Sequence, residues 1–215
     1  MRFLLAIFDL DGTICDTIPD LTTGINVMRA HYGLPPFGED DVRKHINNGA
    51  DLLTRRCLPD DFPADRFGEA KEVYLAAYSE CYMQKTSRYP GMTEAITAIR
   101  SKGIKTAVFS NKGDMHVRNL VGALYPSLFD FTLGDGIYPV KPDPAGAKAI
   151  AARFGCPAEK CVFTGDSHVD MMTAKNAGMF PIGVSWGYRP PELLREYGAG
   201  AIARSPAELA SLIIE

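Results

Sequence analysis

The chain has 215 residues, a formal net charge of −3 at pH 7, 46% hydrophobic residues and 23% charged residues. This length suits one medium domain, or one domain with a smaller insert, and the composition is that of a globular protein. Because the sequence has neither a basic excess nor a long basic run, we expect no nucleic-acid partner and no membrane partner.

The first predicted element is a buried strand over residues 3–9, because this run is apolar throughout rather than alternating. The run is too short to span a bilayer, and no small-residue cleavage site follows it, so we expect a cytoplasmic protein. The five cysteines are an odd number without a C-x-x-C pair, which indicates neither a disulfide framework nor a zinc site.

Residues 17–86 interrupt the strand pattern. They contain no convincing strand, and apolar residues recur at helical spacing from Leu21 to Tyr32 and from Phe67 to Cys81. Turns rich in proline, glycine and aspartate join these stretches. We therefore predict an all-helical inserted domain. The predicted boundaries are residues 16–87 for this insert and residues 1–15 and 88–215 for the core.

After the insert, short apolar strands alternate with helical segments. The predicted strands cover residues 104–110, 160–164 and 180–185, and the predicted helices cover residues 92–102, 145–154 and 169–177. Alternation of apolar strands with helices is typical of a parallel sheet with helices on both faces. The sequence therefore predicts an α/β fold.

Polar side chains stand where the predicted strands end or the following helix begins. These residues are Asp9 and Asp11, Ser110 and Asn111, Lys141, and Asp166 and Asp170. Because the carboxyl ends of parallel strands face one crevice, we expect these side chains to converge. Asp166 and Asp170 are expected at the start of a helix, four residues apart on one face. Taken alone, each of these residues also suits a turn, a helix cap or a solvated surface.

The convergent set favours phosphoryl chemistry. Several carboxylates in one crevice repel one another unless a cation neutralises them, and oxygen ligands suit Mg²⁺, which in turn suits a phosphate substrate. Asp9 is placed to attack phosphorus as a nucleophile. Asp11, after a turn at Gly12, is placed to move a proton as acid and base. Ser110 and Lys141 would hold the transferring phosphoryl group.

In this order and spacing, the residues resemble the four motifs of the haloacid dehalogenase superfamily. The matching stretches are Asp9-Leu10-Asp11-Gly12-Thr13, Ser110-Asn111, Lys141-Pro142-Asp143 and Gly165-Asp166-x-x-x-Asp170. The resemblance implies a Rossmann-like parallel sheet core, an inserted all-helical cap domain and a Mg²⁺-dependent phosphatase. Since true dehalogenases lack the second aspartate, Asp11 argues against dehalogenation.

The resemblance also implies a role for each matching residue. Asp9 would be the nucleophile that forms an aspartyl-phosphate, and Asp11 would be the acid and base. Ser110 and Lys141 would bind phosphate. The implied Mg²⁺ ligands are Asp9, the backbone carbonyl of Asp11, Asp166 and Asp170.

Within the superfamily, residues 46–58 resemble the cap segment of phosphoglycolate phosphatases. This similarity implies that a small phosphorylated metabolite is the substrate, and that Asn47, Asn48 and Gly49 bind it together with Ser110, Asn111 and Lys141. One departure is Asn47, which stands where that group usually has glycine.

Three alternatives stay open at this point. A sugar-phosphate mutase of the β-phosphoglucomutase type shares the core but carries a cationic residue three positions after the cap glycine, where this chain has Leu52. A signalling receiver module also phosphorylates an aspartate at a strand end, but it lacks a helical insert. A catalytically inactive binding protein is disfavoured because no motif residue is missing. The sequence predicts no particular oligomeric state.

Overall fold

The computed structural model describes residues 2–215 and divides the chain into two compact units. The core unit comprises the residues up to Asp16 together with Arg88–Glu215, and the helical unit comprises Thr17–Ser87. The first boundary lies one residue later than the sequence predicts. Within the described residues, none of the helices combines the length and the apolar character that crossing a membrane requires.

The core unit is built on a six-stranded parallel sheet. Its strands are β1 (Leu5–Phe8), β4 (Lys105–Gly113), β5 (Phe131–Asp135), β6 (Cys161–Gly165), β7 (Phe180–Val184) and β8 (Ala201–Ala203). They lie in the order β5-β4-β1-β6-β7-β8, and each neighbouring pair is parallel. Counted along the chain, this order is third, second, first, fourth, fifth, sixth, which is the doubly wound arrangement. The predicted Rossmann-like α/β fold is confirmed.

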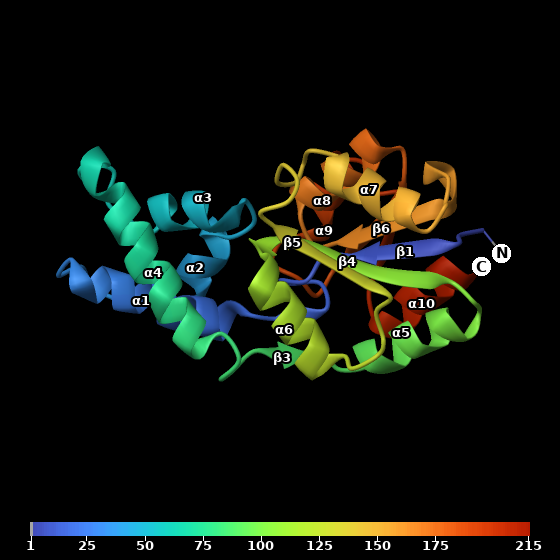
Figure 1. Ribbon diagram of the computed structural model, residues 1–215, viewed down its shortest axis with the longest axis horizontal. Helices are drawn as coiled ribbons and strands as arrows, with labels where there is room; N and C mark the ends of the chain where they lie inside the picture. Colours follow the sequence, from blue (N-terminus) through green and yellow to red (C-terminus); the bar gives the residue numbers. More distant parts are fainter. Residues whose placement is uncertain (1) are drawn as a thin grey trace. The chain divides into compact units, whose positions relative to one another are not determined.

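Helices cover both faces of this sheet (Figure 1). They are α5 (Met92–Ser101), α6 (Asp114–Leu124), α7 (Ala145–Arg153), α8 (His168–Ala177), α9 (Pro191–Glu196), α10 (Pro206–Ile214) and the short 3₁₀ helix η2 (Ala158–Lys160). Figure 1 places α7 and α8 on one face, and α5 and α10 on the other. Parallel strands connected by helices are covered in this way because each crossover returns over one face.

The face covered by α7 and α8 holds a continuous apolar core. Ile7 of β1 lies beside Phe109 of β4 and Phe163 of β6, and Ile150 of α7 and Ala174 of α8 pack against them. The two phenylalanine rings meet edge to face, with their centroids 6.2 Å apart. Burial of this surface is the main force that fixes the helices to the sheet.

The sequence analysis missed two strands of the six-stranded sheet, as well as the two-residue strands outside it, and one strand runs further than predicted. β5 contains Gly134 and a terminal aspartate, and β8 has only three residues, so neither shows a long apolar run. Both are edge strands of the sheet, where burial demands less of the sequence. β4 extends three residues beyond Ser110, to Gly113.

The helical unit contains α1 (Ile18–His31), α2 (Glu39–His45), α3 (Gly49–Arg56), the 3₁₀ helix η1 (Ala64–Arg66) and α4 (Phe67–Cys81). α1 packs along α4. Gly24 permits this close approach, because a methyl group there would lie 3.1 Å from the Cβ atom of Tyr78. The short strands β2 (Cys15–Asp16) and β3 (Ser87–Arg88) pair where the chain passes between the units.

Asp20 fastens the end of the helical unit to its beginning. This side chain near the start of α1 is fully buried, and its carboxylate accepts hydrogen bonds from the main-chain N–H groups of Lys85 and Thr86. The hydroxyl of Thr86 donates a further bond at 2.9 Å. A buried carboxylate is tolerated because every one of these donors compensates for its lost hydration.

Replacing Asp20 with alanine removes the acceptor for all of these donors, and the two donors of Thr86 are buried. We expect Asp20→Ala to lower the free energy of unfolding by about 2–4 kcal/mol, measured by urea denaturation. Asp61→Ala, at an exposed aspartate of the same unit, is the matched control and is expected to change it by less than about 0.5 kcal/mol. Equal stabilities of the two variants would contradict this role of Asp20.

Candidate active site

The acidic residues lie where the order of the strands in the sheet reverses, between β1 and β6. β1 and β6 are neighbours, and Phe8 pairs with Thr164, so both strands end at the same level. Asp9 follows β1 directly, and Asp166 follows β6. In a doubly wound sheet, the crevice beside this switch point is where ligands bind. The predicted convergence of these two carboxylates therefore follows from the fold.

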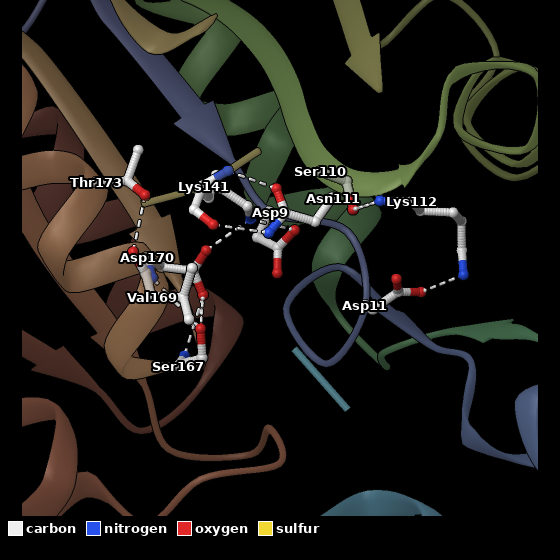
Figure 2. A network of polar contacts seen from close by, with 10 residues as sticks. All are labelled: Asp9, Asp11, Ser110, Asn111, Lys112, Lys141, Ser167, Val169, Asp170 and Thr173. Carbon is white, nitrogen blue, oxygen red and sulfur yellow. Dashed lines mark hydrogen bonds and ion pairs between the residues drawn. The ribbon is translucent and has the colours of Figure 1, made fainter. Parts of the chain in front are cut away.

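Lys141 forms the centre of a buried charge network (Figure 2). Its Nζ atom lies 2.8 Å from Oδ1 of Asp9 and 2.7 Å from Oδ1 of Asp170. The three residues are buried, with 3%, 6% and 0% of their surfaces exposed respectively. Ion pairs shielded from water in this way interact far more strongly than surface pairs.

Asn111 holds the main chain of Lys141 in place. Its amide nitrogen donates to the carbonyl oxygen of Lys141 at 3.0 Å, and its amide oxygen accepts from the Lys141 N–H at 2.7 Å. These two bonds fix where the long side chain of Lys141 begins. Asn111 thus positions a residue of the network, and its expected direct contact with substrate stays a prediction.

Asp170 and Asp166 occupy different environments, which corrects one sequence-based expectation. Asp170 lies in the first turn of α8, where Ser167 caps the helix, and Oδ2 of Asp170 accepts from the N–H and hydroxyl of Ser167. Asp166 precedes His168, the first residue of α8, and therefore does not share a helix face with Asp170. The loop between β6 and α8, rather than helical spacing, brings the two carboxylates together.

The chemistry of the cluster fits a divalent cation. Carboxylate oxygens of Asp9, Asp166 and Asp170 lie within 4.8 Å of one another, and Oδ1 of Asp166 is buried without a hydrogen bond. If all three are ionised, they carry three negative charges against the single positive charge of Lys141. A hard cation such as Mg²⁺ would neutralise the excess and satisfy the orphaned oxygen. The side chain of Asp11 does not belong to this cluster.

Burial and mutual repulsion of the carboxylates raise the pKa values of this cluster, so that it favours bound protons or cations. Desolvation raises the pKa of Asp9 to about 7, Lys141 opposes the rise, and Asp170 and Asp11 add to it. Desolvation and the same neighbour, Asp170, raise the pKa of Asp166 well above its ordinary value. Desolvation works against the charge of Lys141, but Asp170 and Asp9 outweigh it and raise the lysine pKa.

Asp11 is turned to a second lysine, Lys112. Its Oδ1 atom lies 3.0 Å from the Nζ atom of Lys112, and these side chains are 14% and 5% exposed. Figure 2 shows the Asp11 carboxylate directed toward Lys112 and away from the Lys141 network. Gly12 makes the turn after Asp11 with φ of +80°, a conformation that glycine adopts without strain.

A bulge at the end of β4 presents Ser110 and Lys112. The pairing with β5 shifts between Phe109 and Gly113, so three residues of β4 face one residue of β5. The N–H of Lys112 donates to the hydroxyl of Ser110 at 3.3 Å. Bulges next to active sites commonly redirect side chains in this way. Lys112 is not among the predicted site residues, and the structure adds it through its ion pair with Asp11.

Asn47 and Asn48 belong to the helical unit, in the segment that joins α2 to α3, and Gly49 is the first residue of α3. Asn47 has φ of +114° and Gly49 has φ of +81°. The side-chain oxygen of Asn48 accepts a hydrogen bond from Arg56 at 3.2 Å. The φ angle of residue 47 lies in a region that glycine adopts more easily than other residues. Asparagine at this position therefore gives the segment local strain.

Comparison with known proteins now identifies the family. The model of haloacid dehalogenase-like hydrolases matches residues 6–184. The chain is 35% identical to phosphoglycolate phosphatase 1 of Pseudomonas aeruginosa over 86% of this chain and 70% of the relative. It is 33% identical to phosphoglycolate phosphatase of Mannheimia succiniciproducens over 87% and 88% of the two chains.

Solved structures agree with this result. A structure from Lactobacillus delbrueckii subsp. bulgaricus superposes with a TM-score of 0.93 at 32% identity, covering 99% of each chain. The structure of a predicted phosphoglycolate phosphatase from Haemophilus somnus gives a TM-score of 0.91 at 29% identity, covering 99% and 98%. Fold, site and relatives together show that the chain is an enzyme of the haloacid dehalogenase-like hydrolase family.

Proposed function

We propose that the protein is a Mg²⁺-dependent phosphatase that hydrolyses a small phosphate monoester through an aspartyl-phosphate. The observation that carries the proposal is the carboxylate of Asp9, held at the carboxyl end of β1 against Lys141 and beside Asp166 and Asp170. A nucleophilic carboxylate next to a fixed cation and surplus acidic ligands suits attack on phosphorus.

In the first half of the proposed reaction, an Asp9 carboxylate oxygen forms a bond to phosphorus while the bond from phosphorus to the ester oxygen breaks. The departing oxygen takes a proton from the carboxyl group of Asp11. Lys141 and Ser110 bind the oxygens of the transferring group. Mg²⁺, when bound by Asp9, Asp166, Asp170 and the Asp11 carbonyl, supplies the charge that offsets repulsion between the carboxylates and the phosphate.

In the second half, Asp11 accepts a proton from water as that water attacks phosphorus. The bond between phosphorus and the Asp9 oxygen breaks, which releases inorganic phosphate and restores the Asp9 carboxylate. The proton that Asp11 gave up in the first half is thereby regained, so one ester and one water become one alcohol and one phosphate. In the structure the Asp11 carboxylate pairs with Lys112, so both tasks require its side chain to turn from Lys112 toward the departing oxygen.

The proposed substrate class follows from the relatives and from the helical unit. The curated relatives are named phosphoglycolate phosphatases, so we propose 2-phosphoglycolate or a close carboxylate-bearing analogue. We further propose that Thr17–Ser87 acts as the cap that selects the substrate, with Asn47 and Asn48 in contact with it. The cytoplasmic location stays a prediction.

Asp9→Asn tests the nucleophile. The amide cannot attack phosphorus, so we expect turnover to fall by about 10⁴-fold or more. Folding should persist because Lys141 keeps its pair with Asp170, and thermal unfolding checks this. Asp61→Asn, at an exposed position, is the control. Appreciable phosphate release by Asp9→Asn would refute the assignment.

Magnesium should stabilise the fold in a pH-dependent manner. Since the pKa of Asp9 rises from 3.8 to about 7 on folding, the folded state without cation holds more protons than the unfolded chain between these values. Stability from this group therefore falls as pH rises through that window. Because Mg²⁺ binds the deprotonated carboxylates, the rise in the Tm of the protein on addition of Mg²⁺ should be larger at about pH 8 than at about pH 5. An equal gain at both values would contradict the cluster as the binding site.

A panel of phosphate esters separates the phosphatase from the mutase. We expect kcat/KM for release of free phosphate to be about tenfold or more higher for 2-phosphoglycolate than for an ester of similar size without a carboxylate. Conversion of a sugar phosphate to its isomer without net phosphate release would favour the mutase instead.

Excess chelator should abolish the activity and Mg²⁺ should restore it.

A further inference from the structure

A short segment after β7 meets the acidic cluster from outside. The main-chain N–H of Tyr188 donates to Oδ2 of Asp166 at 2.7 Å. The phenol of the same residue lies 3.4 Å from Oδ1 of Asp16, and the indole N–H of Trp186 donates to the carbonyl of Thr13 at 3.0 Å. Tyr188 is 7% exposed, and its bond to Asp166 is buried, whereas the bonds to Asp16 and Thr13 are partly buried.

Gly187 allows this approach because it has no side chain. A methyl group at this position would overlap the Cβ atom of Asp166 and would lie 2.6 Å from the carbonyl oxygen of Gly12. The backbone of Gly187 lies outside the left-handed region. An alanine there would therefore clash sterically with its neighbours but would not strain the backbone. The main chain of this segment is therefore packed directly against Asp166.

The contact divides the two oxygens of Asp166 between two tasks. Oδ2 is fixed by the N–H of Tyr188, whereas Oδ1 is buried and has no hydrogen bond. A carboxylate anchored through one oxygen can offer the other in a constant direction. The unpaired oxygen belongs to the residue that clusters with Asp9 and Asp170.

We propose that residues 186–188 are positioning residues that orient Asp166 for the cation and tie it to residues 13–16, here called the first linker, through which the core unit leads into the helical unit. This inference rests on the proposed Mg²⁺ site. Gly187 and the Tyr188 N–H hold the carboxylate, while the Tyr188 phenol and Trp186 hold Asp16 and Thr13. Asp16 is the last residue of the core unit before the helical unit begins at Thr17.

Calorimetric titration of the whole protein with MgCl₂ tests the first half of the inference. Gly187→Ala displaces Asp166, so we expect the Kd for Mg²⁺ to rise by about tenfold or more. Gly122→Ala is the matched control, because a methyl group there meets nothing within 4 Å and should leave the Kd unchanged. An unchanged Kd for Gly187→Ala would overturn the inference.

Tyr188→Phe tests the link to Asp16 separately. The variant keeps the main-chain N–H, so the Kd for Mg²⁺ should stay within about twofold of the parent, while hydrogen exchange of the amides of residues 14–16 should become faster. A rise in Kd as large as that of Gly187→Ala, or unchanged exchange at the linker, would contradict the proposed division of roles.

A measurement on the parent protein covers the case in which Gly187→Ala does not fold. Binding of Mg²⁺ should slow exchange of the Tyr188 amide, because its acceptor becomes fixed, and unchanged exchange would overturn the inference. If the parent protein binds no Mg²⁺ at all, the proposed function fails as well. If it binds Mg²⁺ and Gly187→Ala binds equally well, only the positioning role fails.

Discussion

The burial of Lys141 between Asp9 and Asp170 is the interaction on which the rest of the site depends. An ammonium group removed from water is strongly destabilised unless anionic partners lie close to it, and here two carboxylates do so. Adding Asp166 to the same buried space leaves negative charge in excess. The core therefore holds a buried anionic cluster with one built-in cation, and the proposed binding of Mg²⁺ and of a phosphoryl group rests on this distribution of charge.

Hydrogen bonds from main-chain groups and short side chains hold this cluster in place. Asn111 fixes the backbone of Lys141, Ser167 fixes Asp170, and the N–H of Tyr188 fixes Asp166. Each of these partners comes from a loop or strand end at the same edge of the sheet. Because these supports are main-chain N–H groups and short side chains at strand ends and loops, the carboxylates hold their positions against mutual repulsion, and the cost of arranging them is met during folding.

The sequence predicted the parts of the fold and site that depend on local pattern. Apolar runs revealed the central strands, and the acidic pair after β1 pointed to phosphoryl chemistry. The edge strands β5 and β8 were missed because burial constrains them weakly. The bulge that turns Lys112 toward Asp11, and the contact of Tyr188 with Asp166, depend on residues distant in sequence, so no local pattern announces them.

We propose that the ester is hydrolysed in two displacements, with a covalent aspartyl-phosphate on Asp9 between them. The stereochemical course at phosphorus tests this proposal most directly. The measurement uses a thiophosphate ester that is chiral through its oxygen isotopes, hydrolysed in isotopically labelled water. Two successive in-line displacements at phosphorus, the first by Asp9 and the second by water, predict retention of configuration. Inversion would mean that water attacks the substrate directly, and it would contradict the account.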